Sequence, residues 1–310
     1  MKKLVIICGA TASGKSSFAI ELAQLLDTSI ISCDSMQIYK DMNIGTAKTN
    51  SCQMQGIKHY MLNVVEPTKE YSVSQYVSDC QPIVDTISDS GAIPIVVGGT
   101  GLYIDGLIYP MSFFGEKNEE VRNRLMKECD SFGAQYMHDK LKKIDSAEAE
   151  KIHCNNTKRV IRALEIFETS GKLKNDFQDK KKGLLYDIFM IFLNPPREVL
   201  YQNINNRVEK MFDDGLITEV EQLLKNGVTW EMQSMQAIGY KELKNYFEKT
   251  MTLAETIDLV KVNTRHYAKR QICWFKRYNF AHSVDPTSEL ECQAIKKMLL
   301  EWVRELDKNC

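Results

Sequence analysis

The first residues with recognisable chemistry are Gly9–Ser16, which read GATASGKS. Gly9, Gly14, Lys15 and Ser16 match the P-loop spacing G-x-x-x-x-G-K-[ST], after a short apolar run and before a helical pattern. In that context backbone N–H groups and a helix N-terminus bind a phosphate, and Lys15 adds a positive charge. The Ser16 hydroxyl is a candidate ligand of Mg²⁺. The motif is typical of nucleotide-binding and ATP-binding proteins, but it does not name the phosphate.

A carboxylate beside the P-loop is the next requirement for most phosphate chemistry. Nucleotide hydrolases and kinases often hold Mg²⁺ with an acid at the end of another strand. The apolar run Ile93–Val97 predicts such a strand, yet Gly-Gly-Thr follows it. An acid stands instead at Asp34, after the apolar run Ser29–Cys33. Because ligands bind at the carboxyl ends of parallel strands, we expect Asp34 beside the P-loop. Spacing alone leaves open whether Asp34 is a general base, a helix cap or a contact to Mg²⁺-bound water.

A third feature is the stretch 261–284, which has six Lys/Arg, no Asp or Glu, and interleaved aromatic residues. Lys261, Arg265 and Lys269 recur every four residues and therefore share one helix face. Residues 140–182 also carry a positive excess, with twelve Lys/Arg and seven Asp/Glu. Both stretches are typical of a surface that binds a nucleic-acid backbone. A solvated helix face with its aromatic residues packed inside explains 261–284 equally well.

The elements that must position these residues alternate between strand and helix up to about residue 108. The predicted strands are 4–8, 29–33, 60–65 and 93–97, and the predicted helices are 15–26 and 73–88. This alternation predicts a parallel α/β sheet. Beyond it the pattern is helical, apart from one apolar strand at 186–193. We predict a P-loop α/β core, a parallel sheet flanked by helices, from residues 1–112 and 185–310, with an inserted all-helical domain at 113–184.

Composition limits the class of protein. The 310 residues are 44% hydrophobic and 26% charged, as in ordinary globular proteins, and the formal net charge is −1. A nucleic acid would therefore be bound by local basic patches. The nine cysteines, odd in number and without C-x-x-C spacing, favour reduced thiols. The first apolar run is too short for a signal peptide, and no run reaches the roughly 18 residues of a membrane span. We expect a cytoplasmic protein without membrane contact and, lacking an exposed heptad pattern, a monomer.

Six blocks of this sequence resemble, in order, those of the tRNA dimethylallyltransferases, also called isopentenylpyrophosphate:tRNA transferases. They are GATASGKS (9–16), DSMQIYKDMNIGTAK (34–48), VVGGTGLY (96–103), KRVIRALEIFETSGK (158–172), SMQAIGYKEL (234–243) and NTRHYAKRQICWFKR (263–277). The resemblance implies transfer of a dimethylallyl group from dimethylallyl diphosphate to the exocyclic N6 amine of an adenosine in tRNA. That adenosine lies 3′ of the anticodon in tRNAs reading U-initial codons. The implied cofactor is Mg²⁺, diphosphate is released, and the partner is the tRNA anticodon stem-loop.

The resemblance also implies roles for matching residues. Asp34 matches the general base, Thr100 lies near the reacting adenine, and Lys15 and Arg207 face the leaving diphosphate. The implied diphosphate-binding residues are Gly9, Ala10, Thr11, Ala12, Ser13, Gly14, Lys15 and Ser16, with Ser16 as the Mg²⁺ ligand. The implied tRNA-binding residues are Asp34, Ser35, Met36, Gln37, Thr100, Arg122, Lys158, Arg159, Val160, Ile161, Arg162, Gln236, Ala237, Ile238, Gly239, Tyr240, Lys241, Lys269, Arg270, Gln271, Trp274 and Lys276. Two departures from the family pattern are Ala10, where proline is usual, and Met111–Asn118, which replaces a Pro-rich link.

Two other classes of function explain part of the pattern. A P-loop small-molecule kinase would use Asp34 as the base for a substrate hydroxyl and would consume ATP, but it gives no use to residues 261–284. An RNA-binding module without activity would leave Lys15, Ser16 and Asp34 without a task.

Overall fold

The computed structural model describes residues 1–110, 118–173 and 183–304. The chain divides into two compact units, residues 1–108 with 184–310, and residues 109–183. We call them the core unit and the insert. The predicted boundary at 112/113, most of the departure at Met111–Asn118, and the part of the basic stretch at 174–182 lie outside the described residues. The other predicted boundary, 184/185, lies next to the division at 183/184.

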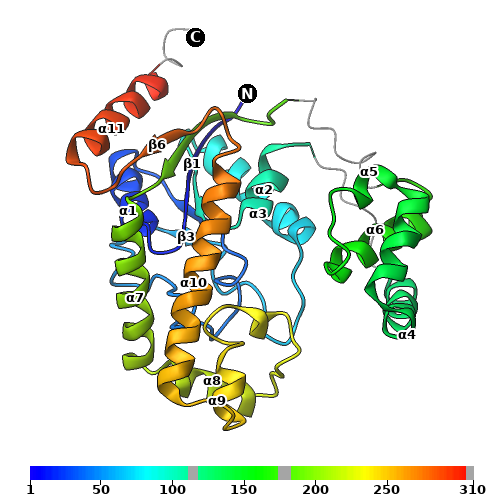
Figure 1. Cartoon of the computed structure of the whole chain (residues 1–310). Helices are drawn as coiled ribbons and strands as arrows, with labels where there is room; N and C mark the ends of the chain where they lie inside the picture. Colours follow the sequence, from blue (N-terminus) through cyan, green and yellow to red (C-terminus); the bar gives the residue numbers. More distant parts are fainter. Residues whose placement is uncertain (111–117, 174–182, 305–310) are drawn as a thin grey trace. The chain divides into compact units, whose positions relative to one another are not determined.

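The core unit contains one six-stranded sheet in the order β3-β2-β4-β1-β5-β6, and every neighbouring pair is parallel (Figure 1). The strands are β1 (Lys3–Gly9), β2 (Ile30–Ser32), β3 (His59–Tyr60), β4 (Ile95–Gly98), β5 (Asp187–Leu193) and β6 (His282–Val284). The central strand β1 is buried along its whole length, as its apolar run predicts. Strand β5 pairs with all of β1, which confirms that the strand after the insert returns to the core sheet.

Two strand predictions were wrong in detail. The predicted strand 60–65 is limited to His59–Tyr60, because Met61 and Asn63 take positive φ angles of 60° and 54°, which no strand accommodates. Only Val65 forms an isolated parallel bridge, to Tyr39. Strand β6 was missed inside a region predicted as helical. It is three residues long and forms by pairing with β5, so tertiary contact rather than a local pattern defines it.

Helices cover both faces of the sheet. On one face α1 (Lys15–Leu25) and α11 (Glu289–Arg304) pack Leu22 and Leu299 against Val5 and Ile7 of β1. On the other face lie α2 (Val73–Asp89), α3 (Gly101–Ile108) and α10 (Leu253–Phe275). There Phe275 contacts Phe192 at 5.9 Å between ring centroids. Successive strand residues point to opposite faces, so the two layers use alternate side chains of the same strands.

The C-terminal half supplies a long helix pair. Helix α7 (Arg197–Asp213) lies beside α10, with the short elements α8 (Leu216–Lys225), η3 (Ser234–Gln236) and α9 (Leu243–Phe247) between them in the sequence (Figure 1). Gly215 separates α7 from α8 and has a positive φ of 99°, a conformation that favours glycine.

The described part of the insert contains helices joined by turns and no strand, as predicted. It consists of α4 (Glu119–Ile144), interrupted at Gly133, α5 (Ser146–Ala149) and α6 (Thr157–Ser170), with its own hydrophobic core. Next to its two ends, within the core unit, the Leu185 N–H donates to the Ile108 carbonyl at 2.9 Å. Within the described part of the chain, no helix combines the length and apolar character needed to cross a membrane.

Candidate active site

The P-loop connects β1 to α1 at the carboxyl edge of the sheet. Gly14 precedes α1 with φ 86°, and Ala12 has φ 61°, so the loop turns sharply just before the N-terminus of α1. Ala10 and Ser13 are buried, and Ser13 still lines a hollow together with Gly14, Lys15 and Ser16. Exposed Ser16 and half-buried Thr11 and Lys15 are the accessible side chains. This placement fits an anion held by backbone N–H groups and a few polar side chains.

Gln271 of α10 fastens the P-loop to the sheet. Its Oε1 accepts from the Thr11 N–H at 2.8 Å, and its Nε2 donates to the Gly99 carbonyl at 2.9 Å. A Cβ at Gly99 would lie 2.2 Å from Nε2, so glycine there makes room for this amide. The sequence had assigned Gln271 to tRNA binding, but it is buried and its amide joins two loops of the core. Its position makes it a support of the diphosphate loop.

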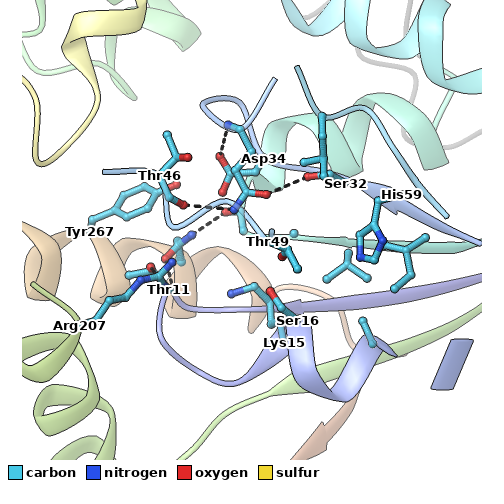
Figure 2. Close-up of a pocket in the computed structure, with 18 residues that line it drawn as sticks. Thr11, Lys15, Ser16, Ser32, Asp34, Thr46, Thr49, His59, Arg207 and Tyr267 are labelled. Atoms are coloured by element: carbon cyan, nitrogen blue, oxygen red, sulfur yellow. Dashed lines mark hydrogen bonds between the residues drawn. The ribbon is translucent and has the colours of Figure 1, made fainter. Parts of the chain in front are cut away.

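Two cations meet at the P-loop. Arg207, from α7, donates through Nη1 to the Thr11 hydroxyl at 3.0 Å, and both it and Lys15 line the same pocket (Figure 2). Burial, and next the charge of Arg207, lower the pKa of Lys15 to about 8, while Asp34 opposes that shift. Burial also lowers the pKa of Arg207, again opposed by Asp34. Two neighbouring cations at one pocket favour a bound polyanion.

Asp34 stands across the pocket from these cations (Figure 2). Its Oδ1 accepts from the N–H groups of Met36 at 2.9 Å and Gln37 at 3.3 Å. These bonds close a turn and no helix begins there, so the helix-cap interpretation was wrong. Thr100 contacts the residue that follows Asp34, because its Oγ1 accepts from the Ser35 N–H at 3.0 Å. Among the described residues no hydrogen bond reaches Asp34 Oδ2, which is therefore the oxygen available to act as a base.

The pocket has a volume of about 90 Å³ and is formed by loops at the carboxyl ends of β1, β2 and β4 and by α7 and α10. Several polar residues that line it were not predicted as site residues. They are Ser32, Thr46, Thr49, His59 and Tyr267. Tyr267 lies beside Asp34, and burial, reinforced by that carboxylate, raises its pKa well above the ordinary value. Its aromatic type at helical spacing looked like a packing residue, and only the tertiary fold places it here.

A second pocket, of about 270 Å³, shares residues with the first. It contains Thr11, Asp34 and Arg207 from the first pocket and several predicted RNA contacts, namely Ser35, Met36, Gln236, Ala237, Ile238, Lys241 and Arg270. The structure therefore brings two segments far apart in the sequence to one opening. Tyr240 is an exception, because its ring is fully buried and its hydroxyl donates to Glu219. Its predicted RNA contact is corrected to a packing role.

The basic stretch of α10 divides into paired and exposed cations. Lys261 binds Glu209 at 2.7 Å, and Arg265 donates to Asn205 at 2.7 Å, so both join α10 to α7. The alternative of a solvated helix face does not describe these two, because their charged groups are paired with side chains of α7. Lys269 and Lys276 are exposed and line a separate hollow with Arg197 and Tyr201. Trp274 packs against Gly101, since a Cβ there would lie 2.2 Å from its ring. A patch of exposed cations thus remains, smaller than the sequence suggested.

In the insert, predicted RNA contacts occupy the N-terminal part of α6 and one position on α4. Lys158 and Arg159 are exposed, whereas Val160 and Ile161 are buried in the insert core, so contact through those two side chains is corrected. Arg122 and Arg162 reach the buried carboxylate of Glu165, at 3.3 Å and 2.8 Å. Each arginine side chain is 30% exposed, so part of its guanidinium remains open to a ligand.

The fold and the site define a class of protein. It is a P-loop α/β protein whose candidate phosphate pocket also contains a carboxylate. A family model described as IPP transferase matches residues 37–278, and one described as isopentenyl transferase matches residues 2–68. The chain belongs to this family, the tRNA dimethylallyltransferases, which are prenyltransferases acting on tRNA.

Individual relatives agree with the family models. A tRNA dimethylallyltransferase of Clostridioides difficile (strain 630) is 44% identical over 309 residues, covering 98% of this chain and 99% of that protein. One from Caldanaerobacter subterraneus subsp. tengcongensis is 44% identical over 283 residues, 90% of each chain. The crystal structure of the full-length tRNA isopentenylpyrophosphate transferase of Bacillus halodurans has a TM-score of 0.75 at 38% identity, over 99% of both chains. A eukaryotic dimethylallyltransferase acting on tRNA has a TM-score of 0.80 at 31% identity, over 94% of this chain and 75% of that one.

Proposed function

We propose that this protein transfers a dimethylallyl group from dimethylallyl diphosphate to the N6 amine of the adenosine 3′ of the anticodon, in tRNAs that read U-initial codons. One observation supports this proposal above the others. A carboxylate with a free oxygen, Asp34, shares a pocket with Lys15 and Arg207. A second opening beside it is lined by RNA-binding candidates, of which Gln236, Lys241 and Arg270 are exposed. The pocket thus offers a base on one side and a diphosphate site on the other.

The reaction balances with these groups. The N6 nitrogen attacks the allylic carbon, the carbon–oxygen bond to diphosphate breaks, and Asp34 accepts the proton that N6 loses. Negative charge grows on the diphosphate as that bond breaks, and fixed N–H groups, Lys15 and Arg207 would stabilise it. The adenine must leave its stack to reach Asp34, at a cost of a few kcal/mol. The second pocket, about 270 Å³ in volume, is the place where it would be received.

Mg²⁺ is proposed as the cofactor. The exposed Ser16 hydroxyl at the start of α1 is a hard oxygen donor, and Mg²⁺ usually combines few protein ligands with waters and substrate phosphate oxygens. Ser16 would hold the ion together with the diphosphate. When bound, the ion would neutralise part of the charge on the leaving group.

The partner proposed is the anticodon stem-loop, bound by a monomer in the cytoplasm. The cations proposed to bind its phosphates are the exposed Lys158 and Arg159 of the insert and the exposed Lys269, Arg270 and Lys276 of the core unit. Each belongs to a sequence block that resembles a tRNA-contact block of the family. Size-exclusion chromatography with light scattering, without and with tRNA, tests the monomer.

One assay tests the reaction. Purified protein is mixed with unmodified tRNA, labelled dimethylallyl diphosphate and Mg²⁺, and the label is followed into tRNA and located by nuclease digestion. Label on the adenosine 3′ of the anticodon is the expected result. ATP turnover without such transfer would favour the P-loop kinase, which family membership already disfavours. RNA binding without transfer would favour an RNA-binding module without enzymatic activity.

A further inference from the structure

The carboxylate of Glu219, in the first turn of α8, accepts four hydrogen bonds from distant parts of the chain. Three come from consecutive backbone N–H groups, those of Asn43 at 2.8 Å, Ile44 at 2.7 Å and Gly45 at 3.2 Å. The fourth comes from the Tyr240 hydroxyl at 2.6 Å. Consecutive N–H groups around one anion form a nest, and charge-assisted hydrogen bonds of this kind are strong. Glu219 therefore fixes the turn at residues 43–45.

That turn leads directly to the active site. The next residue, Thr46, lines both pockets. The carbonyls of Thr46 and Ala47 accept from Gln37 Nε2 at 3.2 Å and 3.5 Å. The backbone N–H of Gln37 donates in turn to Asp34 Oδ1 at 3.3 Å (Figure 2). A continuous set of contacts thus joins Glu219 to the carboxylate proposed as the base.

Tyr240 adds a second connection through the same carboxylate. Its ring packs on the turn so closely that a Cβ at Gly45 would lie 2.3 Å from ring Cε2. Tyr240 belongs to the segment 236–241, of which Gln236 and Lys241 line the second pocket. Glu219 therefore holds together two segments of that pocket, the turn that supports Asp34 and the segment proposed to contact RNA.

We infer that Glu219 is a positioning residue for prenyl transfer, which orients Asp34 through the 43–46 turn and links it to the RNA-binding segment. The inference rests on the proposed function, because that function assigns the base. Glu219 acts through these neighbours and touches no reacting atom. The diphosphate loop is fastened separately, by Gln271, so its affinity does not depend on Glu219.

The test compares Glu219→Gln, Tyr240→Phe and their combination with the wild type. Glutamine keeps one acceptor oxygen but would turn its NH2 group toward either the Asn43 and Ile44 N–H groups or the Gly45 N–H and the Tyr240 hydroxyl, and so loosen the turn. The single-turnover transfer rate at saturating substrates should fall on the order of 10- to 100-fold, as misplaced catalytic groups do. The dissociation constant of dimethylallyl diphosphate should not change. Tyr240→Phe should lose less, and the double variant should be no slower than Glu219→Gln, because Tyr240 acts through Glu219. Glu221→Gln, an exposed carboxylate of the same helix, is the matched control.

Amide hydrogen exchange gives a readout that needs no turnover. Exchange at the N–H groups of residues 43–45 should accelerate in Glu219→Gln and stay slow in Glu221→Gln. An unchanged transfer rate with unchanged exchange overturns the inference, as does a rate loss explained entirely by weaker diphosphate binding. If Glu219→Gln fails to fold, Tyr240→Phe decides, and wild-type exchange and rate in that variant would refute the coupling. A wild type that transfers no prenyl group would contradict the proposed function instead, and exchange would still decide whether Glu219 holds the turn.

Discussion

The Arg207 guanidinium on α7 donates to the Thr11 hydroxyl of the P-loop at 3.0 Å, although 196 positions separate the two residues in the chain. The contact places a second cation beside Lys15 at the loop that a phosphate would occupy. It also means that the P-loop is shaped by the C-terminal half of the protein as well as by its own sequence. Binding and chemistry at this site therefore depend on residues that are distant in the chain.

Replacing Asp34 by Asn should abolish most of the transfer. The amide can still accept from the Met36 N–H, so the turn is kept, but it cannot accept a proton. We expect a loss of roughly 10²- to 10⁴-fold in single-turnover rate, the contribution typical of a general base, with tRNA affinity retained. Asp41→Asn, an exposed carboxylate of the same loop, should behave as the wild type. An unchanged rate in Asp34→Asn would remove Asp34 from the role of base.

Diphosphate affinity should depend on pH through Lys15. A lysine whose pKa is lowered to about 8 loses its charge as the pH rises through that value, well before an ordinary lysine does. Calorimetric titration with inorganic diphosphate should therefore show affinity falling above about pH 8, with net proton uptake on binding. Arginine stays charged throughout this pH range. The Lys15→Arg variant should therefore show only the pH dependence that comes from titration of the diphosphate itself. Identical pH profiles for the two proteins would contradict the prediction.

Salt dependence should separate the exposed cations from the paired ones. Replacing Lys269 and Arg270 by Ala should flatten the slope of log affinity for tRNA against log salt by about 0.7–0.9 for each phosphate that these side chains neutralise. Lys261→Ala, whose ammonium already binds Glu209, should leave the slope unchanged. Filter binding at several salt concentrations measures this, with diphosphate affinity as the internal standard. An unaltered slope in the double variant would locate the RNA contact elsewhere.

Gln271→Leu should weaken diphosphate binding and spare tRNA binding. Leucine leaves the Thr11 N–H and the Gly99 carbonyl without their buried partner, which costs about 1–3 kcal/mol for each unsatisfied group. The P-loop should move and the melting temperature should fall. Gln293→Leu, at an exposed position on α11, controls for the change of residue type. Weaker tRNA binding with intact diphosphate binding would instead restore the RNA contact that the sequence predicted for Gln271.

Local patterns predicted the features that depend on neighbouring residues. The P-loop, the buried strand β1 and the carboxylate after β2 follow from short runs of residue types, and the structure places them together. The strand predicted at 60–65 failed because two left-handed residues interrupt it, which residue type alone does not reveal.

Contacts across long separations were beyond the sequence. Gln271 and Thr11 lie 260 positions apart, and only the packing of α10 under the P-loop brings them together. Tyr267 enters the pocket for the same reason. The pattern of charges in the sequence also did not reveal ion pairs. Glu209 lies on another helix and neutralises Lys261, a cation of α10 that the sequence pattern suggested for nucleic-acid binding.

The hydrogen bond between the Leu185 N–H and the Ile108 carbonyl joins the two core segments at the point where the insert begins and ends. The six strands of the sheet lie before Ile108 or after Leu185 in the sequence. The described helices between the two residues, α4, α5 and α6, contribute no strand to the sheet, so the order of the core strands does not depend on them. The RNA contacts proposed for the insert could therefore differ between relatives, whereas those proposed for the segment 236–241 and for α10 belong to the core unit and adjoin the site.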